Sequence, residues 1–124
     1  MKNFLLKILI FAAAASIGGC YYDNEEELYP DTGGDCDLAN VTYGGTILPI
    51  LQSNCFSCHD AANNNGGVTL EGYANLKIWV NNGYLLGAIR HESSFAPMPQ
   101  GETKLLDCTI QKIEKWVSDG APNN

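Results

Sequence analysis

Two cysteines separated by two residues, with a histidine directly after the second, most constrain what this chain can fold into. The five consecutive residues are Cys55, Phe56, Ser57, Cys58 and His59. Thiols at this spacing can reach the two vinyl groups on one edge of a porphyrin, and the adjacent histidine can then give an imidazole nitrogen to the iron. The pattern predicts one haem c, attached covalently through Cys55 and Cys58, with His59 as an axial ligand.

The sequence leaves two other interpretations of these cysteines open. A zinc site could combine Cys55 and Cys58 with His59, His91 or another cysteine, but the chain has no second Cys-x-x-Cys and no His-x-x-x-His pair. A thioredoxin-like redox pair would need a strand before the motif and a βαβ context, and the sequence shows no strand pattern. Haem attachment is favoured over both.

The N-terminal segment has the pattern of an export signal. Two lysines precede an unbroken apolar run at 8–15, which is too short for a permanent membrane-spanning helix. Residues 17–20, Ile-Gly-Gly-Cys, resemble a bacterial lipobox. Residues 1–19 are therefore predicted to be a lipoprotein signal peptide whose removal leaves Cys20 as a lipidated N-terminus. An ordinary signal peptide that is cut nearby is the alternative.

Charge divides the rest of the chain into two parts. Without residues 1–19, five Lys and Arg residues stand against 14 Asp and Glu residues, a formal net charge of −9. Seven of these acids precede Leu38. We expect residues 20–35 to be an acidic, flexible tether and residues 36–124 to be the cytochrome c domain. The lack of a basic patch argues against binding to nucleic acid.

The odd number of cysteines, five, can be explained. Cys20 takes lipid and two cysteines take haem, which leaves Cys36 and Cys108 as a candidate disulfide. Export to an oxidising compartment would allow this bridge. It would tie the start of the domain to its last helix. Two unpaired thiols are the alternative.

Hydrophobic periodicity predicts an all-α domain. The expected helices cover residues 46–53, 72–82, 84–90 and 105–119. Residues 61–67 and 93–101 are expected to be irregular because they are rich in Asn, Gly, Ser or Pro. Trp79 and Trp116 are expected to be core or haem-packing residues.

Met98 is the favoured sixth ligand of the iron. Beyond the predicted signal peptide it is the only methionine, and His91 is the only histidine besides His59. Two prolines beside Met98 would stiffen its loop, whereas a methionine in a core more naturally lies on an apolar helix face. His91 lies at a polar helix end, where an exposed or capping histidine is the ordinary interpretation. His91 as the ligand, or an open sixth position, are the alternatives.

Residues 41–123 resemble the small c-type cytochrome domains of exported proteins from Bacteroidota and Planctomycetes. The matching stretches are the haem motif with Asn54, Met98-Pro99, and residues 41–43, 47–51, 66–68 and 116–122. The resemblance implies the class I cytochrome c fold, with short helices around one covalent haem. It further implies His59 and Met98 as axial ligands, one-electron transfer, and a pairing of Cys36 with Cys108.

The predicted function is a mono-haem c-type cytochrome that carries single electrons at a membrane and is not an enzyme. No acid–base pair or nucleophile accompanies the predicted haem site, which argues against a hydrolase or a transferase. One alternative is a haem-based sensor or peroxidase-like enzyme with a displaceable sixth ligand. Another is a structural lipoprotein in which haem only stabilises a binding domain.

The predicted partners are redox proteins and, through the lipid on Cys20, a membrane. Tyr21 is not the Asp that, by analogy with other lipoproteins, would retain the chain at the inner membrane. The expected location is therefore the outer membrane, facing the periplasm. The acidic run at 25–27 makes display on the cell surface the alternative.

Overall fold

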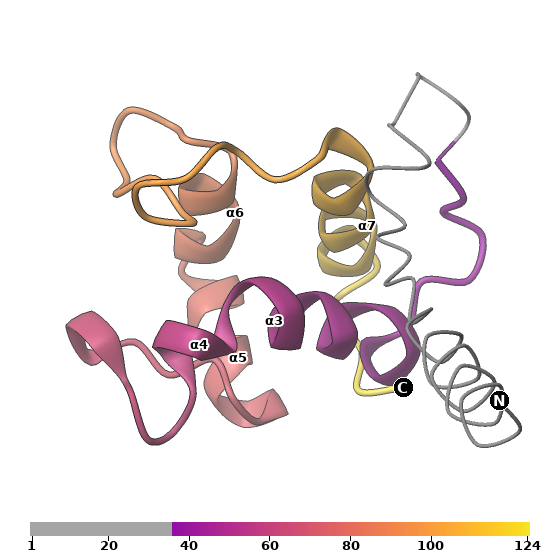
Figure 1. Cartoon of the computed structure of the whole chain (residues 1–124). Helices are drawn as coiled ribbons and strands as arrows, with labels where there is room; N and C mark the ends of the chain where they lie inside the picture. The colour runs from indigo at the N-terminus through magenta and orange to yellow at the C-terminus, as the bar shows by residue number, and fades with distance from the viewer. Residues whose placement is uncertain (1–35) are drawn as a thin grey trace, which may run out of the picture. The chain divides into compact units, whose positions relative to one another are not determined.

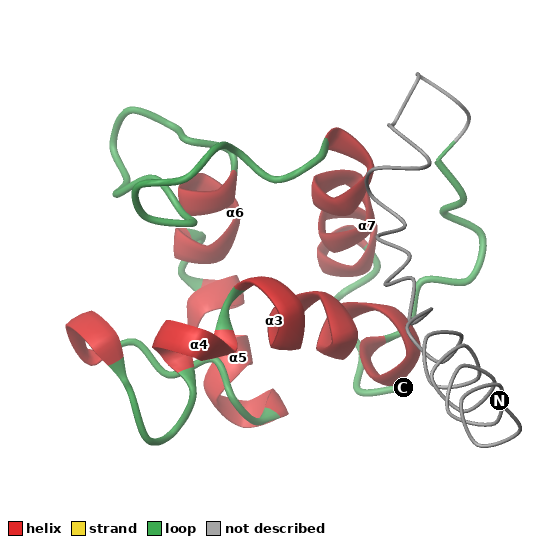
Figure 2. Cartoon of the chain, in the orientation of Figure 1, coloured by secondary structure: helices red, strands yellow, loops and turns green. Residues whose placement is uncertain are grey.

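The computed structural model describes residues 36–124, and this part of the chain forms helices and loops without a strand (Figures 1 and 2). The predicted all-α class is therefore confirmed for these residues. The predicted signal peptide, the lipidation site Cys20 and the acidic segment 20–35 lie outside the described residues. No helix within residues 36–124 is long and apolar enough to cross a membrane.

The helical segments of residues 36–124 are short and follow one another closely. In chain order they are the π-helical turn η2 (Tyr43–Ile47), α3 (Leu48–Asn54), α4 (Phe56–His59), the 3₁₀ turn η3 (Asn65–Gly67), α5 (Tyr73–Asn81), α6 (Tyr84–Ile89) and α7 (Asp107–Ser118). Each predicted helix has a counterpart, and residues 93–101 are irregular, as expected. α4 and η3 were not predicted, because a single turn is too short to give a periodic pattern.

The first helix begins earlier than the predicted start at residue 46. Thr42 caps it, since its hydroxyl oxygen accepts a hydrogen bond from the Gly45 amide at 3.1 Å. Such a cap satisfies one of the donors that a helix start leaves free. η2 then continues into α3, where Pro49 is tolerated because it lies in the first turn.

The last helix begins two residues later than predicted. Leu106 is extended (φ −54°, ψ 142°), and α7 starts at Asp107. A carboxylate in the first turn is favourable because the helix dipole is positive there. Leu105 and Leu106 continue the apolar stripe in the sequence, so periodicity alone could not separate them from the helix.

An apolar core holds the helices together. Its fully buried side chains are Trp116, Ile47, Leu51, Leu76 and Ile113, and no polar or charged side chain is buried within the described range. Tyr43 stacks on Trp116 with ring centroids 5.9 Å apart, which joins the first helix to α7. α6 and α7 stand side by side (Figure 1). The core position predicted for Trp116 is confirmed.

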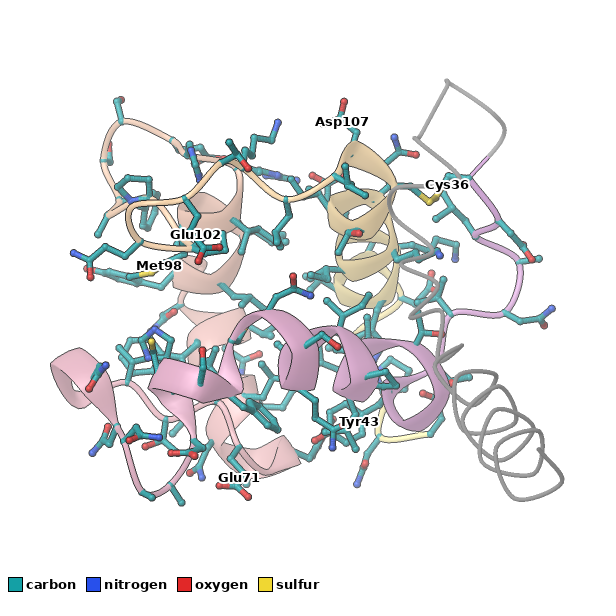
Figure 3. All side chains as sticks on the ribbon, in the orientation of Figure 1. Cys36, Tyr43, Glu71, Met98, Glu102 and Asp107 are labelled. Atoms are coloured by element: carbon teal, nitrogen blue, oxygen red, sulfur yellow. A yellow bond between two sulfur atoms is a disulfide. The ribbon has the colours of Figure 1, made fainter. Side chains whose placement is uncertain are left out.

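Cys36 and Cys108 lie at disulfide-bonding distance, with their Cα atoms 5.5 Å apart. Figure 3 labels Cys36 beside α7, where Cys108 occupies the first turn. The pair is separated by 72 positions in the sequence, so the bridge ties the start of the described residues to the last helix. This geometry agrees with the predicted pairing.

The loop after α6 packs back onto that helix at a glycine. A Cβ atom at Gly87 would overlap the ring of Phe95. A glycine inside a helix costs about 1 kcal/mol relative to alanine, and here it allows the close approach. Tyr84 meets the same ring edge-on at 5.2 Å. Phe95 therefore fixes the path of the loop that carries Met98.

Candidate functional site

The Cys-x-x-Cys-His residues fold as one helical turn at the end of α3. The carbonyl oxygen of Cys55 accepts hydrogen bonds from the amides of Cys58 (3.1 Å) and His59 (2.9 Å). Residues three positions apart lie on the same face of a helix, so the two cysteines share a face and His59 follows directly. Attachment to one edge of a porphyrin requires this arrangement.

The two thiols differ in their surroundings. Cys55 is half-buried and packs against the core, and burial raises the pKa of its thiol to about 11. Cys58 is exposed. Among the described residues both cysteines are free, whereas Cys36 and Cys108 are paired with each other. The Cys55 thiol is therefore protonated near neutral pH and shielded, while the Cys58 thiol is open to solvent.

The imidazole of His59 is oriented by the segment that follows it. Its Nδ1 lies 3.1 Å from the carbonyl oxygen of Val68. Since a carbonyl only accepts, Nδ1 carries the proton and donates. The main chain is held as well, because the Leu70 amide donates to the His59 carbonyl at 2.8 Å. In the neutral form of the ring this tautomer leaves the lone pair on Nε2, which is the nitrogen that could then bind a metal.

A tight loop returns the chain to His59. The carboxylate of Asp60 accepts hydrogen bonds from the amides of Ala62 (3.0 Å) and Asn63 (2.6 Å), which turns the chain directly after the motif. Gly66 and Gly67 then have φ values of 66° and 75°, a left-handed conformation that glycine adopts without steric cost. The loop ends at the residue whose carbonyl orients the imidazole.

Trp79 holds this returning segment from α5. Its indole Nε1 donates to the carbonyl oxygen of Thr69 at 3.1 Å, and its ring packs against the core. Thr69 directly follows Val68, the hydrogen-bond acceptor for His59. Trp79 therefore steadies the segment that orients the predicted axial ligand, which adds a positioning contact to the core role expected for it.

Met98 lies in the irregular loop after α6, and the end of α6 holds its backbone. Its amide donates to the carbonyl of Ala88 at 3.0 Å, and its carbonyl oxygen lies 3.0 Å from Nε2 of His91. Figure 3 shows the Met98 side chain on the side of its loop that faces α4 in this view. His91 is half-buried and follows Arg90, the C-cap residue of α6, so the sequence-based interpretation of His91 as an exposed or C-cap histidine is wrong.

The side-chain contact of His91 is made to the loop that carries Met98. Its Nε2 is engaged with the backbone of Met98. Two further positioning contacts at the site come from the carbonyl oxygens of Val68 and Ala88. Sequence reasoning missed these two residues because every residue carries a carbonyl, and their side chains give no signal.

The structure does not support the two alternative interpretations of Cys55 and Cys58, a zinc site and a thioredoxin-like redox pair. Within residues 36–124 no three His, Cys, Asp or Glu side chains gather as a group that could hold a metal ion, so the zinc hypothesis is not supported. The helix α3, not a strand, precedes Cys55. The context of a thioredoxin-like redox pair is therefore missing from the described range.

The donors that the chain does present suit a covalently attached haem. Cys55 and Cys58 supply two free thiols on one face of a turn, and His59 supplies an imidazole with an available Nε2. A thioether is the fourth group, on a loop whose backbone is fixed. Comparisons with protein-family models, characterised proteins and solved structures found no significant match to this chain.

Proposed function

We propose that residues 36–124 form a class I cytochrome c-like domain that carries one haem c and transfers single electrons. The observation that carries the proposal is the helical turn of Cys55, Cys58 and His59, in which Nδ1 of the histidine donates to Val68 and Nε2 is left for iron. The all-α character and the short helices support the fold part of the proposal. The resemblance of residues 41–123 to small c-type cytochromes supports the cofactor.

Cys55 and Cys58 would attach the haem through thioethers. Each thiol would add across one vinyl group of the haem, with its sulfur bonding to one vinyl carbon and its hydrogen to the other, so that no group would leave. The reaction needs reduced thiols, which these two cysteines are. Because Cys36 is paired with Cys108, neither of these two cysteines has a free thiol that could react with the haem in place of Cys55 or Cys58.

His59 and Met98 would be the two protein ligands of the haem iron. The Val68 carbonyl fixes the tautomer and the orientation of the His59 ring, and hydrogen bonding at Nδ1 makes Nε2 a stronger donor. When bound, haem c supplies a one-electron couple at its iron, and His/Met ligation raises its potential. Partly buried apolar residues that pack against the core, among them Phe56 and Val68, would supply apolar contacts to it.

The domain is proposed to act as an electron carrier and not as an enzyme. Two filled axial positions would close the iron to gases and peroxide. Redox proteins are the proposed partners. The proposal includes three features that are based on the N-terminal sequence pattern: lipidation of Cys20, attachment to the outer membrane and an acidic tether at 20–35.

Carbon monoxide tests this function directly. The purified, reduced, haem-loaded protein should give a six-coordinate spectrum that carbon monoxide leaves unchanged over minutes, because a protein ligand occupies each axial position. A haem protein with an open sixth position, measured in parallel, is the control. Rapid binding of carbon monoxide would instead support the sensor or peroxidase-like alternative.

A further inference from the structure

His91 occupies a backbone position that favours glycine. It follows the last turn of α6 with φ 58°, in the left-handed region that costs most L residues about 1–2 kcal/mol. Its amide donates to Ala88 (3.2 Å), and the amide of Glu92 donates to Gly87 (3.0 Å). This hydrogen-bond pattern ends many helices, usually with glycine at the left-handed position. Compared with glycine, a histidine at this position has the steric cost of the left-handed backbone, but it adds an imidazole side chain.

The side chain reaches the predicted sixth ligand. Nε2 of His91 lies 3.0 Å from the carbonyl oxygen of Met98, and Nε2 must donate because a carbonyl only accepts. The amide of Met98 donates to Ala88 at 3.0 Å. Both backbone polar groups of Met98 are therefore held by the last turn of α6 and the residue that ends it.

Phe95 fixes the path of the loop, and the two hydrogen bonds fix Met98 itself within it. Residues 91–106 contain no helix or strand. A methionine side chain has three rotatable bonds, so the position of its sulfur is defined only if its backbone is defined. The Ala88 contact fixes one side of the residue, and the His91 contact fixes the other.

We propose that His91 is a positioning residue for axial ligation: its imidazole holds the Met98 carbonyl and thereby keeps the thioether in place as the sixth ligand. This inference rests on the function proposed above. It also changes the role of His91 from an alternative ligand of the iron to a residue that positions the ligand Met98. His91 and Met98 are not competing ligands, because the histidine acts on the iron only through the methionine.

The test compares variants that suit the left-handed backbone but cannot reach Met98. His91→Gly relieves the backbone, and His91→Asn is tolerated there and carries a shorter side chain. His91→Gln keeps a donor at similar reach. The measurements are the ferric charge-transfer band of an iron–thioether bond, the rate at which carbon monoxide binds the reduced protein, the reduction potential and the unfolding free energy.

Loss of one hydrogen bond should increase the fraction of iron without its thioether. We expect His91→Gly and His91→Asn to raise the rate of carbon monoxide binding about two- to tenfold, the factor that corresponds to one typical hydrogen bond. The charge-transfer band should weaken and the potential should fall, while stability stays the same or increases. His91→Gln should recover the band in part.

The outcomes separate this inference from the function on which it rests. If His91→Asn and His91→Gly leave the band, the rate and the potential at their wild-type values while Met98→Ala abolishes the band, the inference is wrong and the proposed function stands. A band that weakens only in proportion to unfolded protein would also overturn it. If the wild-type protein has no thioether band, or no haem, the proposed function fails.

Discussion

Met98→Ala should lower the reduction potential of the haem-loaded protein and open its iron to carbon monoxide. A thioether stabilises ferrous over ferric iron, and its loss leaves water or nothing in the sixth position. We expect a fall on the order of 100 mV, which is a fraction of the roughly 0.8 V range that axial ligands span. Spectroelectrochemical titration measures the potential, and carbon monoxide binding is followed by absorption.

Gln100→Ala is the matched control for this change. Gln100 lies in the same loop and is exposed, and it makes no hydrogen bond within the described residues. Its removal should change neither the potential nor the response to carbon monoxide. If Met98→Ala behaves like Gln100→Ala, Met98 does not ligate the iron, and another group holds the sixth position.

Cys36→Ser combined with Cys108→Ser should lower the free energy of unfolding by about 4 kcal/mol. The bridge closes a loop across 72 positions, and the reduced chain regains the conformational entropy that the bridge removes from the unfolded state. The described domain is also small, so burial of its apolar core gives only a small free energy of unfolding. Denaturant titration of the haem-loaded protein with and without the substitutions measures the loss.

The two single substitutions make this test specific. If the cysteines stabilise the fold only through their bond, each single variant should lose as much as the double variant. Losses that add, or a total below about 1 kcal/mol, would show that the cysteines act separately or that they are not bridged. The haem spectrum should be unchanged in all three variants, since the bridge lies at α7 and not at the motif.

Apolar periodicity predicted the helices well where their ends coincide with turn residues. The predicted helix at 72–82 is α5, which lies one residue inside that range at each end, and the predicted 84–90 is α6, one residue shorter. Periodicity failed where a cap decided the boundary. Thr42 starts the first helix ahead of the apolar residues, and Leu106 continues the apolar stripe without being helical.

The candidate site was predictable where its residues are contiguous in sequence. Cys55, Cys58 and His59 share one turn because the motif itself is a turn in length. The partners of His59 and Met98 were not predictable, since a carbonyl oxygen belongs to every residue and its direction depends on the whole fold. The position of His91 was not predictable for another reason. The left-handed position after a helix is ordinarily occupied by glycine, so a histidine gives no signal for it.

The mass of the fragment that contains the motif tests the central claim most directly. The chain should be produced with its own N-terminal segment in a bacterium that attaches haem c, in which a known c-type cytochrome is shown to acquire its haem. Cleavage after Glu27 and Glu71 gives a fragment of residues 28–71 without the predicted lipidation site. The Cys55→Ser and Cys58→Ser double variant is the control.

After reduction, alkylation and denaturation, we expect the wild-type fragment to carry the mass of one haem and a single alkyl group, on Cys36. Both thiols of the motif would be consumed by thioethers that survive denaturation. The control fragment should carry no haem. A wild-type fragment with three alkylated cysteines and no added haem, from cells that mature the known cytochrome, would contradict the proposal that this domain is a c-type cytochrome.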